Sequence, residues 1–171
     1  MGDGTVVKAF RRLQHTDHPT TNREDHDRIT RLLWRTEAET YERLQNALPL
    51  ECYVPKYHGR VDPQALGLPQ ALAKGPYLPG CGLLLEKLEG TDVKVAHLEP
   101  ELQQRVEAVL ERIGDTCGKL DLWDASCFYP GSRAEFTLID FAVPDEYGEL
   151  IDILNRRGAL PEQTRRVLRL D

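Results

Sequence analysis

The stretch Leu138-Ile139-Asp140-Phe141-Ala142 decides how this chain is interpreted, together with Leu120-Asp121-Leu122 upstream. A short apolar strand is expected to carry Asp140 into a turn, and Asp121 stands 19 positions earlier. Acidic residues at the ends of strands and loops can hold a metal ion and take a proton from a hydroxyl group. The pair therefore predicts a chemical centre built on Asp121 and Asp140.

Length and charge limit the classes of protein to which this chain could belong. At 171 residues the chain suits one domain, or one domain with a small appended lobe. Its formal net charge of −6 argues against a main role in nucleic-acid binding, because such proteins usually carry a basic face. No apolar run is long enough to span a membrane, and the first residues lack the apolar core of a signal peptide. We therefore expect a cytoplasmic protein with no nucleic-acid or membrane partner.

Two groups of residues raise the question of metal binding. The cysteines form no C-x-x-C pair, so they are interpreted as reduced thiols that mostly fill the core. A polar segment at residues 15–27 is rich in His and Asp, which favours a metal site as one interpretation. A solvated loop is the other, because no expected helix or strand would hold the ligands in place. The residues concerned are Cys52, Cys81, Cys117 and Cys127, and in the loop His15, Asp17, His18, Asp25, His26 and Asp27.

Hydrophobic periodicity and turn signals divide the chain into short strands and helices. Strands are expected at residues 5–10, 53–59, 82–88 and 136–139. Helices are expected at residues 29–47, 100–120, 146–155 and 161–168. Residues 61–80 are interpreted as an irregular connection, and residues 89–92 and 128–131 as turns. This order predicts an α+β protein, with a small antiparallel sheet lobe at residues 1–90 and a helical lobe at residues 91–171.

Three motifs in the first half resemble the protein-kinase-like and aminoglycoside-phosphotransferase-like family. Val6-Val7-Lys8-Ala9-Phe10 resembles the strand whose lysine meets the ATP phosphates. Residues 34–44 resemble the helix whose glutamate pairs with that lysine, which implies Glu37, with Glu39 as the alternative. Residues 83–90 resemble the hinge strand whose backbone contacts adenine, and Glu86 is the residue assigned to it. The resemblance implies a reduced two-lobe kinase-like fold.

Two further motifs in the second half are similar to the catalytic segments of the same family. Residues 119–126 resemble the catalytic loop H-x-D-L-x-x-x-N, which implies that Asp121 is the base. Residues 138–141 resemble the metal-binding D-F-G segment, which implies that Asp140 holds Mg²⁺. ATP and Mg²⁺ are the cofactors that follow from the resemblance.

The chain departs from the family pattern at several positions. No glycine-rich loop precedes Lys8, so the strands that would cover the phosphates are expected to be missing. Lys119 replaces the catalytic-loop His, Ala142 replaces the D-F-G glycine, and Ser126 stands where an Asn would hold a second metal. The chain is therefore interpreted as an N-terminally truncated and degenerate relative. A truncated sheet would leave an open edge, which favours a protein partner or a homodimer.

Three functions remain open. The first is a pseudokinase-type binding protein with weak or no phosphotransferase activity. The second is an active ATP- and Mg²⁺-dependent small-molecule phosphotransferase, or another transferase, on a trimmed kinase-like fold; retention of Lys8, Glu37, Asp121 and Asp140 motivates it, because buried charges are costly unless paired. The third is an unrelated α+β binding module, in which these residues make only an ion pair and anchor turns.

Overall fold

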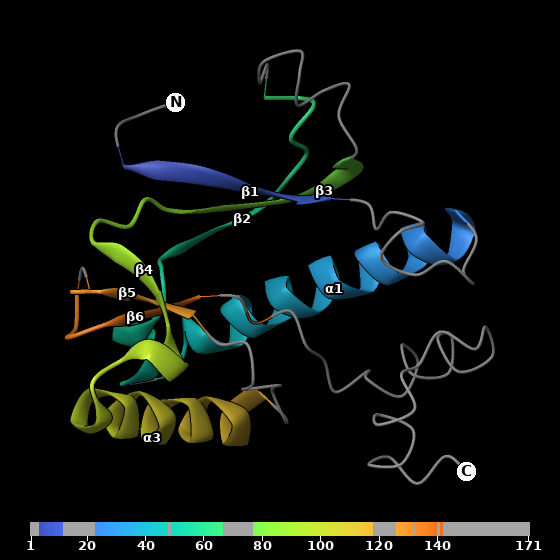
Figure 1. The fold of residues 1–171 in the computed structure, drawn as a ribbon. Helices are drawn as coiled ribbons and strands as arrows, with labels where there is room; N and C mark the ends of the chain where they lie inside the picture. The colour runs from blue at the N-terminus through green and yellow to red at the C-terminus, as the bar shows by residue number, and fades with distance from the viewer. Residues whose placement is uncertain are drawn as a thin grey trace, which may run out of the picture.

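The computed structural model describes residues 4–11, 23–47, 49–66, 77–117, 126–131, 133–139 and 141. This part of the chain is α+β, with two small antiparallel sheets and two long helices (Figure 1). The expected class is confirmed. The helices expected at residues 146–155 and 161–168 lie outside the described residues.

The first sheet consists of β1 (Thr5–Arg11), β2 (Tyr57–Val61) and β3 (Tyr77–Glu86), in the order β1-β3-β2. Both neighbours run antiparallel to the central strand β3. Cys81, Leu83 and Leu85 are buried at alternate positions of β3, as expected of a strand with one face on the core. Lys8 pairs with Leu83, so it lies midway along β1, an edge strand of the sheet.

The start of β3 corrects the expectation of an irregular segment at residues 61–80, because residues 77–80 belong to the strand. Proline and glycine usually interrupt strands, but the sheet accommodates Pro79 and Gly80 at a shift in the pairing of β1 with β3. Ala9 pairs with Gly82 and Arg11 with Tyr77, so the ladder shifts register beside these two residues. Bulges are where strands accommodate proline. The strand expected at residues 53–59 begins only at Tyr57, and a short 3-10 helix, Leu50–Tyr53, precedes it.

Helix α1 (Arg23–Leu44) packs on the first sheet. Its buried apolar residues form two runs at three-residue spacing, as in the stripe of an amphipathic helix: Ile29 and Leu32, then Ala38, Tyr41 and Leu44. The indole Nε1 of Trp34 donates a hydrogen bond to the Gly82 carbonyl, at 3.2 Å. The guanidinium of Arg60 binds the Glu42 carboxylate through Nε and Nη2, at 3.1 and 3.2 Å. Side chains on β2 and backbone on β3 thus hold α1 in register.

The helix begins six residues earlier than expected, so the expectation of a loop is wrong for residues 23–27. The charged stretch here has no apolar stripe of its own. His26 is nevertheless buried, and its carbonyl accepts a hydrogen bond from the Thr30 hydroxyl at 2.9 Å. Tertiary burial extends the helix beyond the range where hydrophobic spacing predicts it. Residues 12–22 lie outside the described part.

The second sheet consists of β4 (Thr91–Lys94), β5 (Ser126–Tyr129) and β6 (Thr137–Ile139), in the order β4-β5-β6. Cys127 lies opposite Val93 on one side and Leu138 on the other. Turns were expected at residues 89–92 and 128–131, so β4 and β5 correct that expectation. The second half of the chain is therefore not only helical. Gly90 has a φ of +109°, and its turn leads directly into β4.

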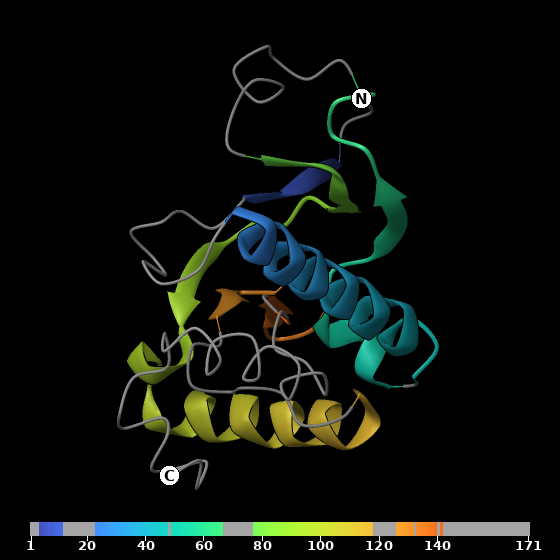
Figure 2. The ribbon, with the colours of Figure 1, turned by 90° about the vertical axis from the view of Figure 1, so that its right-hand side faces the viewer.

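Helix α3 (Pro100–Cys117) packs against α1, so that α1 lies between the first sheet and α3 in both views (Figures 1 and 2). The buried apolar residues form one continuous cluster that joins both sheets and both helices; it includes Phe10, Tyr41, Leu83, Val106, Ile113 and Leu138. The division into lobes at residue 90 stays a prediction. All four cysteines are free thiols. Neither α1 nor α3, the long helices of the described part, carries a stretch apolar enough to span a bilayer.

Candidate functional site

An ion pair between Lys8 and Glu37 is the centre of the candidate site. The Lys8 ammonium lies 2.8 Å from each of the two carboxylate oxygens of Glu37. The Glu37 side chain is fully buried, whereas 31% of the Lys8 side chain is exposed. Glu37 and not Glu39 is therefore the partner of Lys8. The pair expected from the motifs is present, and its role in binding a cofactor stays a prediction.

The burial of this pair has an energetic consequence. A carboxylate taken wholly out of water costs several kcal/mol unless hydrogen bonds and a counter-charge compensate it. Lys8 supplies both, and its ammonium also lies 5.5 Å from the centre of the Phe10 ring. The carboxylate and the ring hold the ammonium in place, and part of the Lys8 side chain stays accessible to solvent. Such a fixed, half-exposed positive charge can bind an anionic group without rearranging.

Val6 completes the accessible face beside Lys8. Residues two apart on a strand project from the same face, so Val6 and Lys8 point to the same side of β1. The Val6 side chain is 40% exposed, which makes it one of the exposed large apolar residues of the described part. The motif argument did not single out Val6. The sequence could have indicated Val6, because a residue two positions from Lys8 on a strand projects from the same face.

Glu86 lies at the end of β3, and its polar groups are engaged within the protein. Its N–H donates to the Lys56 carbonyl at 2.8 Å, and its carboxylate accepts the Lys56 N–H at 3.0 Å. The Nε of Arg133 lies 3.6 Å from the same carboxylate oxygen. The N–H of Lys87 donates to the Gly4 carbonyl at 2.8 Å. A backbone donor for a ligand at this strand end would therefore come from beyond Lys87, and the assigned role of Glu86 stays a prediction.

Arg133 connects this strand end to the second sheet, a contact that the motifs did not predict. It lies in the turn between β5 and β6, and its Nη2 donates to the Val54 carbonyl. One guanidinium thus joins the end of β3, the segment before β2 and the β5–β6 turn. Nearby, Arg105 on α3 binds the Glu135 carboxylate with two hydrogen bonds, at 3.0 and 2.8 Å. The β5–β6 turn is therefore held from two directions.

The remaining predicted residues are only partly placed. Asp121 and Asp140 lie outside the described residues. The backbone of Ser126 begins β5 and pairs with Ile139, the residue before Asp140. Phe141, the residue after Asp140, is buried against Tyr41 of α1, with 5.3 Å between ring centroids. The chain on both sides of Asp140 is thus anchored, at β6 and on α1, and α1 is also the helix that carries Glu37.

No group of three or more His, Cys, Asp or Glu side chains gathers into a metal site within the described residues. His26 from the polar segment lies buried on α1, while His15, Asp17 and His18 fall outside the described part. The predicted Mg²⁺ ligands Asp140 and Ser126 are not tested by this finding, because neither side chain is described.

The hydrogen-bonded network beside α1 shifts the pKa of its members. Burial, followed by the Glu42 carboxylate, raises the pKa of the Tyr57 phenol above its ordinary value. The hydrogen bond from Arg60 to Glu42 raises the pKa of that guanidinium. Both shifts keep the donors of the network protonated, so Tyr57 and Arg60 continue to hold Glu42 and, through it, helix α1.

Comparison of the chain with protein-family models, with curated proteins and with solved structures gave no match.

Proposed function

We propose that this protein is a kinase-like scaffold that acts mainly by binding, with weak or no phosphotransferase activity. The observation that carries the proposal is the ion pair between Lys8 on β1 and the buried Glu37 on α1, 2.8 Å apart. In kinases this type of pair positions the lysine for the nucleotide phosphates. A strand, a helix and the candidate hinge strand β3 meet around the pair, in the order that the resemblance implies.

The residues around Lys8 fit a nucleotide. The ammonium offers a fixed positive charge for phosphate oxygens, and exposed Val6 offers an apolar surface for a planar base on the same side of β1. Asp140 and Ser126 are the residues that would hold Mg²⁺, and the ion would neutralise phosphate charge when bound. Within the protein, Lys8 would orient the phosphates and Glu37 would keep Lys8 in position.

Two departures in sequence favour binding over catalysis. Ser126 stands where the family has a second metal ligand, and a serine hydroxyl is a poorer ligand than an amide oxygen. Ala142 replaces the glycine after Phe141, which removes backbone freedom at that position. Phosphoryl transfer depends almost entirely on positioning and charge stabilisation, so the loss of one ligand should lower the rate by orders of magnitude.

An active transferase is the second candidate, and one observation favours it. A fully buried Glu37 is costly to keep, and replacement of such pairs by apolar residues is often neutral or stabilising. If Lys8 had no ligand to position, the retention of the Lys8–Glu37 pair would have no explanation. In this alternative Asp121 takes a proton from a substrate hydroxyl, and the substrate is a small molecule.

A homodimer through the free edge of β1 is the partner that we propose. Because Lys87 bonds to the Gly4 carbonyl, alternation along an antiparallel ladder turns the backbone groups of Thr5, Val7 and Ala9 away from β3. Among the described residues, no strand pairs with that edge. An antiparallel copy centred on Val7 would place Val7 opposite Val7. It would also place each Lys8 opposite a Val6, so the two lysines do not meet.

Thermal unfolding with ATP and Mg²⁺ tests the nucleotide site. We expect millimolar nucleotide to raise the melting temperature, because ligand that binds only the folded state stabilises it. Lys8→Met should remove the shift, whereas Lys56→Met, at an exposed lysine of the same sheet region, should keep it. No shift in the wild-type protein at millimolar nucleotide would contradict nucleotide binding.

Activity separates the two candidates. A phosphate-release assay on the wild-type protein should give little or no turnover if the protein is a binding scaffold. Turnover that disappears in Asp121→Asn, with nucleotide binding retained, would establish the active transferase instead. Asp140→Asn should abolish only the Mg²⁺-dependent part of the thermal shift, and an unchanged shift would remove Asp140 from the metal site.

A further inference from the structure

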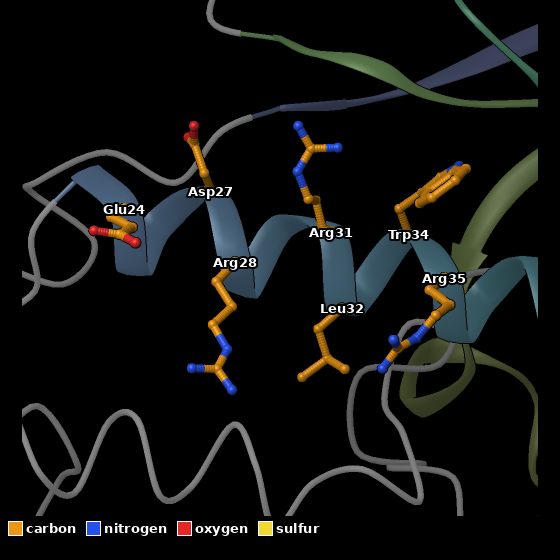
Figure 3. Close-up of a pocket in the computed structure, with 7 residues that line it drawn as sticks. All are labelled: Glu24, Asp27, Arg28, Arg31, Leu32, Trp34 and Arg35. Carbon is orange, nitrogen blue, oxygen red and sulfur yellow. The ribbon is translucent and has the colours of Figure 1, made fainter.

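A cavity of about 550 Å³ opens along the N-terminal half of α1 (Figure 3). Among the described residues that line it, arginine is the commonest type; these residues are Glu24, Asp27, Arg28, Arg31, Leu32, Trp34 and Arg35. Arg28, Arg31 and Arg35 are all exposed. The chain as a whole carries a net charge of −6, so three arginines in one cavity are a local reversal of its charge.

The arginine cavity is separate from the Lys8–Glu37 site. Successive residues of an α-helix are about 100° apart around its axis, so Arg35 and Glu37 differ by roughly 160°. By the same rule Arg28 lies about 20° from Arg35 around the axis, and Arg31 about 40° from it. Glu37 is fully buried, whereas Arg28 and Arg35 are exposed and point away from the strands in Figure 3. Arg28 and Arg35 therefore lie on the face of α1 opposite Glu37, and Arg31 lies between that face and the sheet.

Two residues of the cavity are held in place by the first sheet. A guanidinium nitrogen of Arg31 lies 3.8 Å from the Cys81 sulfur and donates to it. The indole of Trp34 donates to the Gly82 carbonyl, and the Arg60 guanidinium lies 5.4 Å from the centre of its ring. In Figure 3, Arg31 and Trp34 project to one side of the helix and Arg28 and Arg35 to the other. A ligand that lies along the helix beside Arg31 and Trp34 would meet a partly preformed wall, which lowers the entropic cost of binding.

The chemistry of the lining favours phosphoryl groups. Guanidinium groups present planar, paired N–H donors that match phosphate oxygens, and arginine stays charged at every physiological pH. Arg28 and Arg35 lie about 10 Å apart along the helix axis, at a rise of about 1.5 Å per residue. That span suits a ligand with more than one anionic group. Glu24 and Asp27 offset part of the charge, and the arginines outnumber them.

We propose that this cavity binds a small ligand that carries two or more phosphoryl groups, at a site distinct from the one at Lys8. Calorimetric titration with inorganic pyrophosphate at an ionic strength of about 0.15 M, where long-range attraction is screened, is the test. The wild-type protein should show saturable binding. Arg35→Gln should weaken it roughly tenfold or more, the expected loss for one charge-assisted hydrogen bond.

Matched variants make the outcome decisive. Arg112→Gln removes one exposed arginine from α3 and should leave the pyrophosphate affinity unchanged. Arg28→Gln provides a second cavity variant if Arg35→Gln does not fold. Lys8→Met should also leave the affinity unchanged at a temperature where circular dichroism shows this destabilised variant to be folded, which separates this site from the nucleotide site. Absence of saturable binding, equal losses in Arg35→Gln and Arg112→Gln, or loss of binding in folded Lys8→Met would each overturn the proposal.

Discussion

The ring of Phe141 meets the ring of Tyr41 edge-on, with 5.3 Å between centroids and an interplanar angle of 80°. Phe141 follows the predicted metal ligand Asp140 in sequence, and Tyr41 lies one helical turn beyond Glu37 on α1. The contact joins two segments that are 100 residues apart, and both rings belong to the continuous core. The position of α1 and the position of the chain at Phe141 are thereby linked.

Phe141→Ala should be strongly destabilising. Removal of a buried phenylalanine side chain typically costs about 3–5 kcal/mol, because transfer and cavity terms add. Urea unfolding gives the change in the free energy of unfolding. Tyr129→Ala is the control, because 42% of Tyr129 is exposed and its truncation should change stability by at most about 0.5 kcal/mol. Equal effects of the two variants would contradict the anchoring role of Phe141.

The two partners of the buried ion pair should respond unequally to substitution. Lys8→Met leaves the fully buried Glu37 carboxylate without its lysine, which should cost about 3–5 kcal/mol. Glu37→Gln should cost less, because Lys8 is partly exposed and can be hydrated. The double variant Lys8→Met/Glu37→Leu should be less destabilised than the sum of its single changes. Additive free energies in this double-mutant cycle would show that the two side chains are not coupled.

Val7→Lys should keep the protein monomeric if two copies pair through β1. It would place like charges opposite one another at the centre of the proposed interface. Light scattering after size-exclusion chromatography measures the mass, and the wild-type protein should give that of a dimer at high concentration. Leu66→Lys, at an apolar residue 41% exposed and beyond the other edge strand, should leave the dimer intact. A wild-type protein that stays monomeric at every concentration would rule out the interface.

The cysteines should differ in reactivity and make stability depend on pH. Burial raises the pKa of the Cys81 and Cys127 thiols, so iodoacetamide should modify the half-buried Cys52 first. A thiol whose pKa is raised by folding stabilises the folded state below its ordinary pKa, and this contribution is lost as the pH rises through the raised value. The free energy of unfolding should therefore fall as the pH rises above the ordinary thiol pKa of about 8.5, and it should fall less in Cys81→Ala. Mass spectrometry identifies the modified residue, and Cys52→Ser should remove the fast phase.

Two glycines should respond in opposite directions to alanine. Gly90 has a φ of +109°, and a Cβ there would lie 2.6 Å from the Pro130 carbonyl oxygen, so Gly90→Ala should cost at least about 1–3 kcal/mol. Gly114 lies within α3, and a Cβ there would meet no atom within 4 Å. Gly114→Ala should stabilise the protein by about 0.5–1 kcal/mol, the helix preference of alanine over glycine. Thermal unfolding of the two variants measures the contrast.

Local sequence pattern predicted the elements that bury a regular apolar face. The stripes that include Tyr41 on α1 and Val106 on α3 recur with the helical period, and the short apolar run at Leu138 reads as a strand. The pairing of Lys8 with Glu37 also followed from sequence, because a lysine strand and a glutamate helix stand in the order of a known motif. The helices and the strand depend on residues near one another in sequence, whereas the Lys8–Glu37 pair, 29 residues apart, was expected only from the order of the motifs.

Contacts between distant residues could not be predicted in the same way. Strand β4 exists because Val93 pairs with Cys127, 34 residues away, and its four residues carry no strong strand signal of their own. The beginning of α1 depends on the burial of His26. The first residues of β3 depend on the shifted pairing with β1 beside Arg11. In each case long-range packing outweighs the local preference.

The sequence by itself determined the α+β class, the two long amphipathic helices and the charged residues at Lys8 and Glu37. Hydrophobic period and residue type are local properties, so they can be read without a structure. Only the tertiary structure decided that Glu37 is fully buried, that Val6 stands exposed beside Lys8, and that three arginines share a cavity along α1. The burial of a side chain, and the neighbour that each face of a helix meets, depend on which other elements pack against it. The packing of those elements is determined by the whole chain.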